Sequence, residues 1–168
     1  MESSSNLIST RDDVILGLHE PNTADFIGGR TGGNPFNDCS SWKGRDITAV
    51  RLGCSTVFLF YIQLKYGDTW APQHGLQDGC DPESLYGVRS IQNVTYDLDP
   101  SEYVTSISGT SHPTRTYVQS ITFRTNKRTL PRCGPEDGVK KTVNGSHLLY
   151  ISGRKGCVID GIELHWLQ

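Results

Sequence analysis

The chain has 168 residues and a formal net charge of −2, and 18 of its residues are glycine. This length is enough for one domain with a core of its own, and the charge gives no reason to expect nucleic acid as a partner. No apolar run is long enough to cross a bilayer, so no membrane span is expected.

The first 24 residues are predicted to form an N-terminal extension. Within it, residues 13–18 have the composition of a single strand, which Pro21 and Asn22 would end. The first residues lack the basic and apolar parts of a signal peptide. Two interpretations stay open: a cytoplasmic protein, or the mature form of a secreted protein with an added methionine. The domain itself is predicted over residues 25–168.

The domain begins with a glycine-rich stretch, residues 26–38. Its two glycine pairs, Gly28-Gly29 and Gly32-Gly33, lie too close together for a regular strand. We therefore predict a loop whose backbone can closely approach a ligand or another strand, because glycine has no Cβ.

Eight strands are predicted to follow, because short runs rich in Val, Ile, Thr and Tyr are bounded by turn residues. They cover residues 47–52, 57–66, 90–98, 103–107, 117–125, 140–143, 147–151 and 158–167. Between the sixth and seventh, Asn144-Gly145 predicts a two-residue hairpin. No stretch has sustained helical periodicity. The sequence thus predicts an all-β sandwich, barrel or prism with essentially no helix.

The chain also contains an internal repeat. Aligning Gly53 with Gly153 places Ile62 on Ile162 without a gap, and a third copy with a longer loop places Ile121 at the same point. Three copies predict three similar hairpins around a shared core. The three isoleucines are expected at equivalent, buried positions.

Only the last copy ends its loop with a carboxylate. Glycines in residues 153–160 expose backbone N–H groups, and Asp160 adds a charged acceptor beside them. Phe60 and Gln119 stand at the matching position of the other two copies. Donors beside one fixed acceptor suit a ligand rich in hydroxyl groups, so one sugar site per chain is predicted.

Five cysteines are present, at positions 39, 54, 80, 133 and 157, and none forms a C-x-x-C motif. Either two disulfides leave one thiol over, or all five are reduced and packed as small apolar residues. Glycosylation sequons at Asn93 and Asn144 favour a secreted or extracellular protein.

Three motifs form a recognisable pattern. They are Gly-Gly-x-x-Gly-Gly-Asn-Pro-Phe at residues 28–36, the strand at residues 117–126, and the ending over residues 152–166, which contains Gly156-x-x-x-Asp160. Together they resemble the jacalin-related lectins, and the ending is most similar to the animal, zymogen-granule type. The resemblance spans residues 26–168. It implies the β-prism I fold, three four-stranded antiparallel sheets with pseudo-threefold symmetry.

The same resemblance implies a sugar between the first glycine loop and the Gly-x-x-x-Asp loop. Backbone N–H groups of the two loops would donate to the sugar, and the Asp160 carboxylate would accept from two adjacent sugar hydroxyls. The implied site consists of Gly33, Gly156, Cys157, Val158 and Asp160, flanked by Asn34, His112 and Lys155.

Mannose- or glucose-type sugars are the expected ligands, on glycans, glycoproteins or polysaccharides. The chain lacks the cleaved N-terminal glycine with which the galactose-binding branch admits galactose. Two features depart from the family pattern: the first glycine loop is one residue longer, and Cys157 and Val158 stand where some members carry an aromatic residue. A shallow site of this kind predicts a homodimer or higher oligomer that gains by avidity.

Catalysis is not expected. No Gly-x-Ser-x-Gly motif is present, and the loop offers one carboxylate where a glycosidase needs two. The histidines show no metal-ligand spacing, so neither a metal nor a cofactor is predicted. The alternative is a structural or matrix-targeting module that binds polysaccharide or anionic glycan through a basic face, formed by Lys127, Arg128, Arg132, Lys140 and Lys141.

Overall fold

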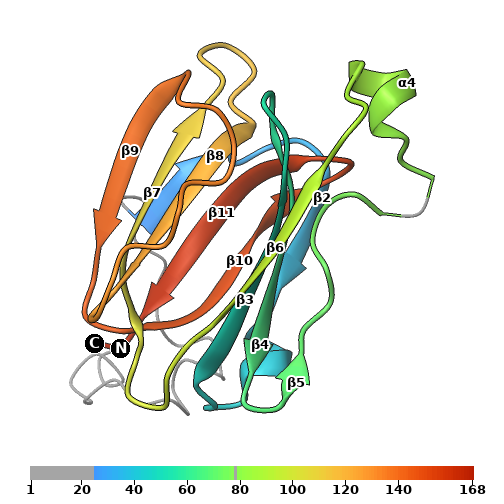
Figure 1. Ribbon diagram of the computed structural model, residues 1–168. Coiled ribbons are helices and arrows are strands. Elements are labelled where there is room, and N and C mark those ends of the chain that lie inside the picture. Colours follow the sequence, from blue (N-terminus) through green and yellow to red (C-terminus); the bar gives the residue numbers. More distant parts are fainter. Residues whose placement is uncertain (1–24, 78) are drawn as a thin grey trace, which may run out of the picture.

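Three antiparallel sheets surround a single core in the computed structural model, which describes residues 25–77 and 79–168 (Figure 1). Sheet A has the order β1 (Phe26–Gly28), β11 (Ile159–Trp166), β10 (Leu148–Lys155) and β2 (Asn34–Asn37). Sheet B has the order β5 (Thr69–Trp70), β4 (Leu59–Tyr66), β3 (Ile47–Cys54) and β6 (Gln92–Asp97). Sheet C has the order β8 (Val118–Thr125), β7 (Val104–Ser111) and β9 (Val139–Asn144). The extension predicted for residues 1–24, with its candidate strand, lies outside the described residues.

The predicted set of three sheets is confirmed, with one difference in sheet C. In the described part of the chain this sheet has three strands instead of the predicted four. The fourth place is taken by an irregular segment, which pairs with β8 only through the isolated bridges Ile121–Cys133 and Arg124–Thr129. Pro131, which lies between the two bridges, has no N–H to donate and so interrupts a regular ladder.

The three predicted hairpins are β3–β4, β7–β8 and β10–β11. Ile62, Ile121 and Ile162 occupy equivalent places in them, and each side chain is 0% exposed, as predicted. The glycine alignment, however, was wrong by one residue. Ile121 and Ile162 pair with glycines, but Ile62 pairs with Leu52, and Gly53 comes one position later.

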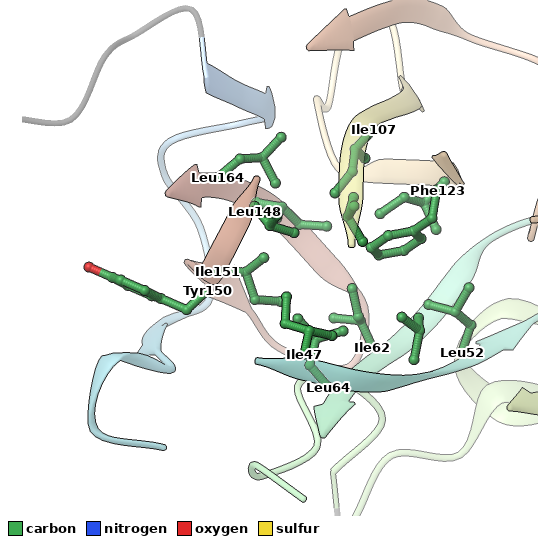
Figure 2. Close-up of a cluster of buried hydrophobic side chains, with 14 of the residues drawn as sticks. Ile47, Leu52, Ile62, Leu64, Ile107, Phe123, Leu148, Tyr150, Ile151 and Leu164 are labelled. Atoms are coloured by element: carbon green, nitrogen blue, oxygen red, sulfur yellow. The ribbon is translucent and has the colours of Figure 1, made fainter. Parts of the chain in front are cut away.

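The core lies where the inner faces of the three sheets meet (Figure 2). Ile62 and Leu52 from sheet B, Ile107 from sheet C and Ile151 from sheet A point toward one another there. Each is at most 1% exposed. Full burial of a side chain of this size contributes roughly 1.5 to 3 kcal/mol. The alternation of apolar and polar residues along the strands is therefore what fixes their register.

The Asn144-Gly145 hairpin prediction was wrong. β9 and β10 belong to different sheets, so this turn carries the chain from sheet C to sheet A. Gly145 donates its N–H to the Thr105 carbonyl at 2.9 Å. Its Cα lies so close to the Trp166 ring that a Cβ would overlap it. Packing of the C-terminal strand under the turn therefore overrides the local hairpin preference.

Two short helices in the described part of the chain also depart from the all-strand prediction: α3 (Cys39–Trp42) and α4 (Pro82–Tyr86). The side chain of Asp81 caps α4 by accepting from the N–H of Glu83 at 3.1 Å, and Pro82 occupies the first turn. Gly87 ends the helix in the left-handed region at φ 69°. These local signals are present in the sequence but are too short to create helical periodicity.

Two disulfides form, Cys54–Cys133 and Cys80–Cys157. The alternative in which two bridges leave one thiol over is therefore the correct one, and Cys39 is the remaining thiol. Cys54–Cys133 joins sheet B to the segment beside sheet C and belongs to the main core. Cys80–Cys157 instead joins the segment before α4 to the loop between β10 and β11.

Candidate functional site

The first glycine loop and the β10–β11 loop lie against each other at one end of the molecule. Gly29 donates its N–H to the backbone oxygen of Asp160 at 2.8 Å. Gly32 and Gly33 have φ angles of 93° and 55°, and a Cβ on Gly33 would overlap the Asp160 carboxylate and the Lys155 carbonyl. Only glycine fits this contact, because it tolerates positive φ and has no Cβ.

Arg154 holds the glycine loop in place. Its guanidinium donates to the backbone oxygens of Gly32 at 2.7 Å and Gly33 at 3.0 Å. Burial raises the pKa of Asp160 above its usual range, and the nearby positive charge of Arg154 opposes this increase. Arg154 thus fixes the loop and favours the ionised carboxylate.

Backbone and carboxylate groups are left open at this end. Within residues 25–77 and 79–168, no group donates a hydrogen bond to the Asp160 carboxylate, and none accepts from the N–H of Gly33 or Cys157. Asp160 is half-buried. A half-buried acceptor beside open donors is an arrangement that an external ligand can satisfy.

The other predicted residues contribute in different ways. No atom packs against the Cα of Gly156. Its N–H is used within the loop, where it donates to the backbone carbonyl of Val158 at 2.9 Å. The Val158 side chain is buried in a small apolar cluster under the loop. Asn34 is exposed and pairs with Lys155 across β2 and β10. The structure therefore brings the predicted set together, but the side chain of Val158 faces inward.

His112 lies in the loop between β7 and β8. Its Nδ1 accepts from the N–H groups of Thr114 at 3.2 Å and Arg115 at 3.0 Å, so the imidazole stabilises its own loop. Thr116, in the same loop, packs directly on Gly29. The β7–β8 loop thus supports the glycine loop through Thr116, not through His112.

Two tyrosines that pack on the apolar cluster under the β10–β11 loop were not predicted from the sequence. The rings of Tyr86 and Tyr117 pack on Phe58 at centroid distances of 4.9 and 5.0 Å. Burial raises the pKa of Tyr86, and the negative charge of Asp160 adds to the increase, which places this phenol within electrostatic range of the carboxylate. Figure 1 shows α4, which carries Tyr86, at the same end as the β10–β11 turn. No motif could have indicated Tyr86, because only the fold brings α4 to this end.

The basic cluster predicted from the sequence is divided. Arg128 pairs with the buried Glu102 at 2.9 Å, and Lys127 lies 3.8 Å from Asp99. Arg132 and Lys140 instead line a groove of about 360 Å³ on the outer face of sheet C, together with Arg124 and a set of hydroxyl-bearing residues. A single basic face of all five residues does not form.

The described part of the chain has neither a cluster of metal-binding side chains nor a membrane-spanning helix. No group of three or more His, Cys, Asp or Glu side chains is placed to hold a metal ion. No helix there has the length and apolar character needed to cross a bilayer.

Three antiparallel sheets around one core, with an open donor and acceptor set at one end, define a β-prism of the lectin class. The sequence matches the Jacalin-like lectin domain over residues 25–165. The chain therefore belongs to the jacalin-like lectin family. Its members bind carbohydrate without chemistry, so the protein is a carbohydrate-binding protein and not an enzyme.

Individual relatives agree with this assignment. Zymogen granule membrane protein 16 of Rattus norvegicus is 29% identical over 168 residues, which cover 98% of this chain and 86% of that protein. The mannose-binding lectin from Champedak is 25% identical, with a TM-score of 0.67 over 88% of this chain and 96% of that one. A mannose-specific jacalin-related lectin from Morus nigra, solved with mannose, is 26% identical, with a TM-score of 0.64 over 83% of this chain and 90% of that one.

Proposed function

We propose that the protein is a lectin for mannose- or glucose-type sugars, bound between the first glycine loop and the β10–β11 loop. The observation that carries the proposal is the Asp160 carboxylate, half-buried and without a hydrogen-bond donor among the described residues. The relative from Champedak is a mannose-binding lectin and the one from Morus nigra is mannose-specific, which supports the choice of sugar.

The chemistry of the site fits a hydroxyl-rich ring. Asp160 would accept from two adjacent sugar hydroxyls, and hydrogen bonds to an ionised acceptor are roughly twice as strong as neutral ones. The N–H groups of Gly33, Cys157 and Val158 would donate to sugar oxygens. These donors belong to the backbone and are already ordered, so binding costs little side-chain entropy. Tyr86 and Tyr117 would border the ring with aromatic surface.

Asp160→Ala is expected to abolish retention on a mannose column. Loss of a charged acceptor leaves sugar hydroxyls unpaired and costs about 1.5 to 3 kcal/mol. A single-site monosaccharide affinity on the order of millimolar would then fall below detection. The melting temperature should change little, because the carboxylate makes no hydrogen bond with the described residues.

Two controls make the result specific. Glu163→Gln changes a carboxyl group on the same strand, three residues from the site, and should leave retention intact. Ile107→Ala removes a fully buried side chain of the main core in sheet C, and should lower stability by about 2 to 5 kcal/mol while sparing sugar binding at low temperature. Continued retention of Asp160→Ala would place the site elsewhere.

A second function is favoured by the groove on sheet C. Arg124, Arg132 and Lys140 line it beside Ser and Thr hydroxyls. Its one carboxylate, Glu136, lies 3.7 Å from Arg132, so the groove keeps an excess of positive charge that suits an anionic polysaccharide. We propose that this face lets the protein act as a matrix-targeting module. Asp160→Ala should then still bind a sulfated polysaccharide column, and Lys140→Ala with Arg132→Ala should lose this binding while keeping mannose retention. If Asp160→Ala and the Lys140→Ala, Arg132→Ala double variant elute from the sulfated column at the same point, the groove does not bind the polysaccharide and the second function is wrong.

We also propose an extracellular location and an oligomeric state for this chain. The exposed Asn93 and Asn144 sequons and the two disulfides support the location, since disulfides persist in oxidising compartments. An oligomer would compensate by avidity for the weak monovalent binding that we expect of a single shallow site.

A further inference from the structure

The β10–β11 loop is held by a segment of chain that lies far away in the sequence. The disulfide Cys80–Cys157 joins residues 77 positions apart, with their Cα atoms at 5.6 Å. Beside it, Leu76 donates its N–H to the Cys157 carbonyl at 3.2 Å. The Gln77 side-chain amide donates to the Gly156 carbonyl at 2.7 Å and accepts from the Lys155 ammonium. Three neighbouring residues of the loop are therefore positioned by Leu76, Gln77 and Cys80.

The two disulfides of the protein differ in their exposure. Cys54 and Cys133 are 6% and 3% exposed and belong to the main core. Cys80 and Cys157 are both half-buried, at the surface of the molecule. A thiolate must reach a sulfur atom to open a disulfide, so reaction depends on access. An external thiol should therefore open Cys80–Cys157 first.

The backbone beside the Cys80–Cys157 disulfide is loosely packed. Gly79 and Gly156 flank its two cysteines, and no atom packs within 4 Å of the place where a Cβ would stand on either glycine. Val158, one residue further on, is anchored in the apolar cluster with Phe58 and Phe60. Opening the bond would thus loosen Gly156 and Cys157, while Lys155 stays paired in β10 and the start of β11 stays in place.

We propose that Cys80–Cys157 is a redox-controlled tether that orders the β10–β11 loop, and that its reduction weakens ligand binding at Asp160. The binding part of this inference rests on the sugar site proposed above. A loop already fixed in its bound conformation loses less entropy when a ligand binds. Releasing it should therefore lower affinity without unfolding the prism, because the core disulfide remains closed.

The reaction needs a low-molecular-weight thiol such as glutathione as reductant. Its thiolate attacks one cysteine sulfur, the protein S–S bond breaks, and a mixed disulfide forms while the other cysteine leaves as a thiolate. A second thiol attacks the mixed disulfide and releases the remaining cysteine. The two protein sulfurs gain two electrons and two protons overall, and the reductant leaves as its own disulfide.

The order of reduction is tested by treating the folded protein with increasing glutathione, trapping thiols by alkylation and locating them by mass spectrometry. Cys80 and Cys157 should be labelled well before Cys54 and Cys133. Hydrogen–deuterium exchange of residues 153–160 should accelerate at the same glutathione concentration, while exchange in β4 and β8 stays unchanged. Simultaneous opening of both disulfides, or unchanged exchange in the loop, would overturn the tether.

Affinity is tested on the same samples with methyl mannoside by calorimetry. Selective reduction should weaken binding by roughly threefold to tenfold and reoxidation should restore it. The double variant Cys80→Ser with Cys157→Ser should bind at the weaker level and should not respond to glutathione. Unchanged affinity after reduction refutes control of binding by the tether. If the oxidised protein binds no mannoside at all, the proposed sugar site fails, and the exchange measurement still decides whether the tether orders the loop.

Discussion

Glu102 shows at the scale of one residue how neighbours reverse the effect of burial. Its side chain is 1% exposed, and burial alone would raise its pKa. Hydrogen bonds from Arg128, from the Thr125 hydroxyl and from the Asp99 N–H outweigh burial and lower the pKa to about 2. The carboxylate thus joins the β6–β7 connection to the end of β8.

This pKa predicts loss of stability in acid. Because the folded pKa is lowered, the stabilisation is fully present above pH 4.5 and is lost as pH falls toward 2. The full shift corresponds to about 3 kcal/mol, and solvent screening of the half-exposed Arg128 should reduce it to about 2 kcal/mol. Urea unfolding of the wild type and Glu102→Gln should differ by this amount at pH 6 and converge near pH 2. A difference that is independent of pH would show that Glu102 acts only through packing.

Asp38 forms a second buried network, which needs no external ligand. His74 Nε2 lies 2.6 Å from one carboxylate oxygen, and the Tyr66 hydroxyl donates to the other at 2.8 Å. The His74 ring stacks on Phe36 at 3.9 Å. The contrast with Asp160 is informative: one carboxylate is fully paired within the fold, and the other is left open at its end.

At the scale of elements, the long strands could be predicted from the sequence and the short ones could not. β3, β4, β7, β8, β10 and β11 each have eight residues, and the sequence predicts all six, although the predicted strands end four residues before the ends of β7 and β10. β1, β2 and β5 have two to four residues, and their pairing is decided by strands distant in sequence. The meeting of Gly33 with Asp160 was anticipated from motifs. Tyr86 was not anticipated, because only the fold brings α4 to this end of the molecule. The Cys80–Cys157 disulfide was not anticipated either, because cysteine spacing does not select a pairing.

The glycine loop predicts a sharp difference between two similar substitutions. Gly33→Ala should abolish mannose retention, because the new Cβ would overlap the Asp160 carboxylate and the Lys155 carbonyl. Gly67 is a matched control, since it has φ 63° and its nearest neighbour is the flexible Arg45 side chain, at 3.1 Å. Both variants should lose roughly 1 to 2 kcal/mol from backbone strain, but only Gly33→Ala should lose the sugar. Retention of Gly33→Ala on the column would mean that this contact does not shape the site.

At the scale of the whole molecule, pseudo-threefold symmetry is broken in the loops. At the position of Asp160 in the β10–β11 hairpin, the β3–β4 hairpin has the fully buried Phe60 and the β7–β8 hairpin has Gln119. The three hairpins share a core but only one has the open carboxylate. One chain should therefore bind one sugar, and multivalent binding must come from association of chains.

Valency predicts how binding should depend on surface density. Methyl mannoside should bind on the order of millimolar, while a dense mannose surface should retain the protein much longer than a sparse one. Surface plasmon resonance at graded mannose densities, with light scattering on the same sample, checks this. Density-independent kinetics from a monomer would contradict the oligomer. Non-reducing electrophoresis then tests whether Cys39 links two chains.

The last strand sets a direction for the molecule. Asp160 and Trp166 stand at opposite ends of β11, about 20 Å apart for six extended residues, and the C-terminus emerges away from the loops (Figure 1). If the chain is attached to a solid support through its final residues, the proposed sugar site faces away from the support. If the chain is attached near the first glycine loop, the support covers the proposed sugar site. Orientation of attachment alone should thus decide whether a coated bead captures mannose.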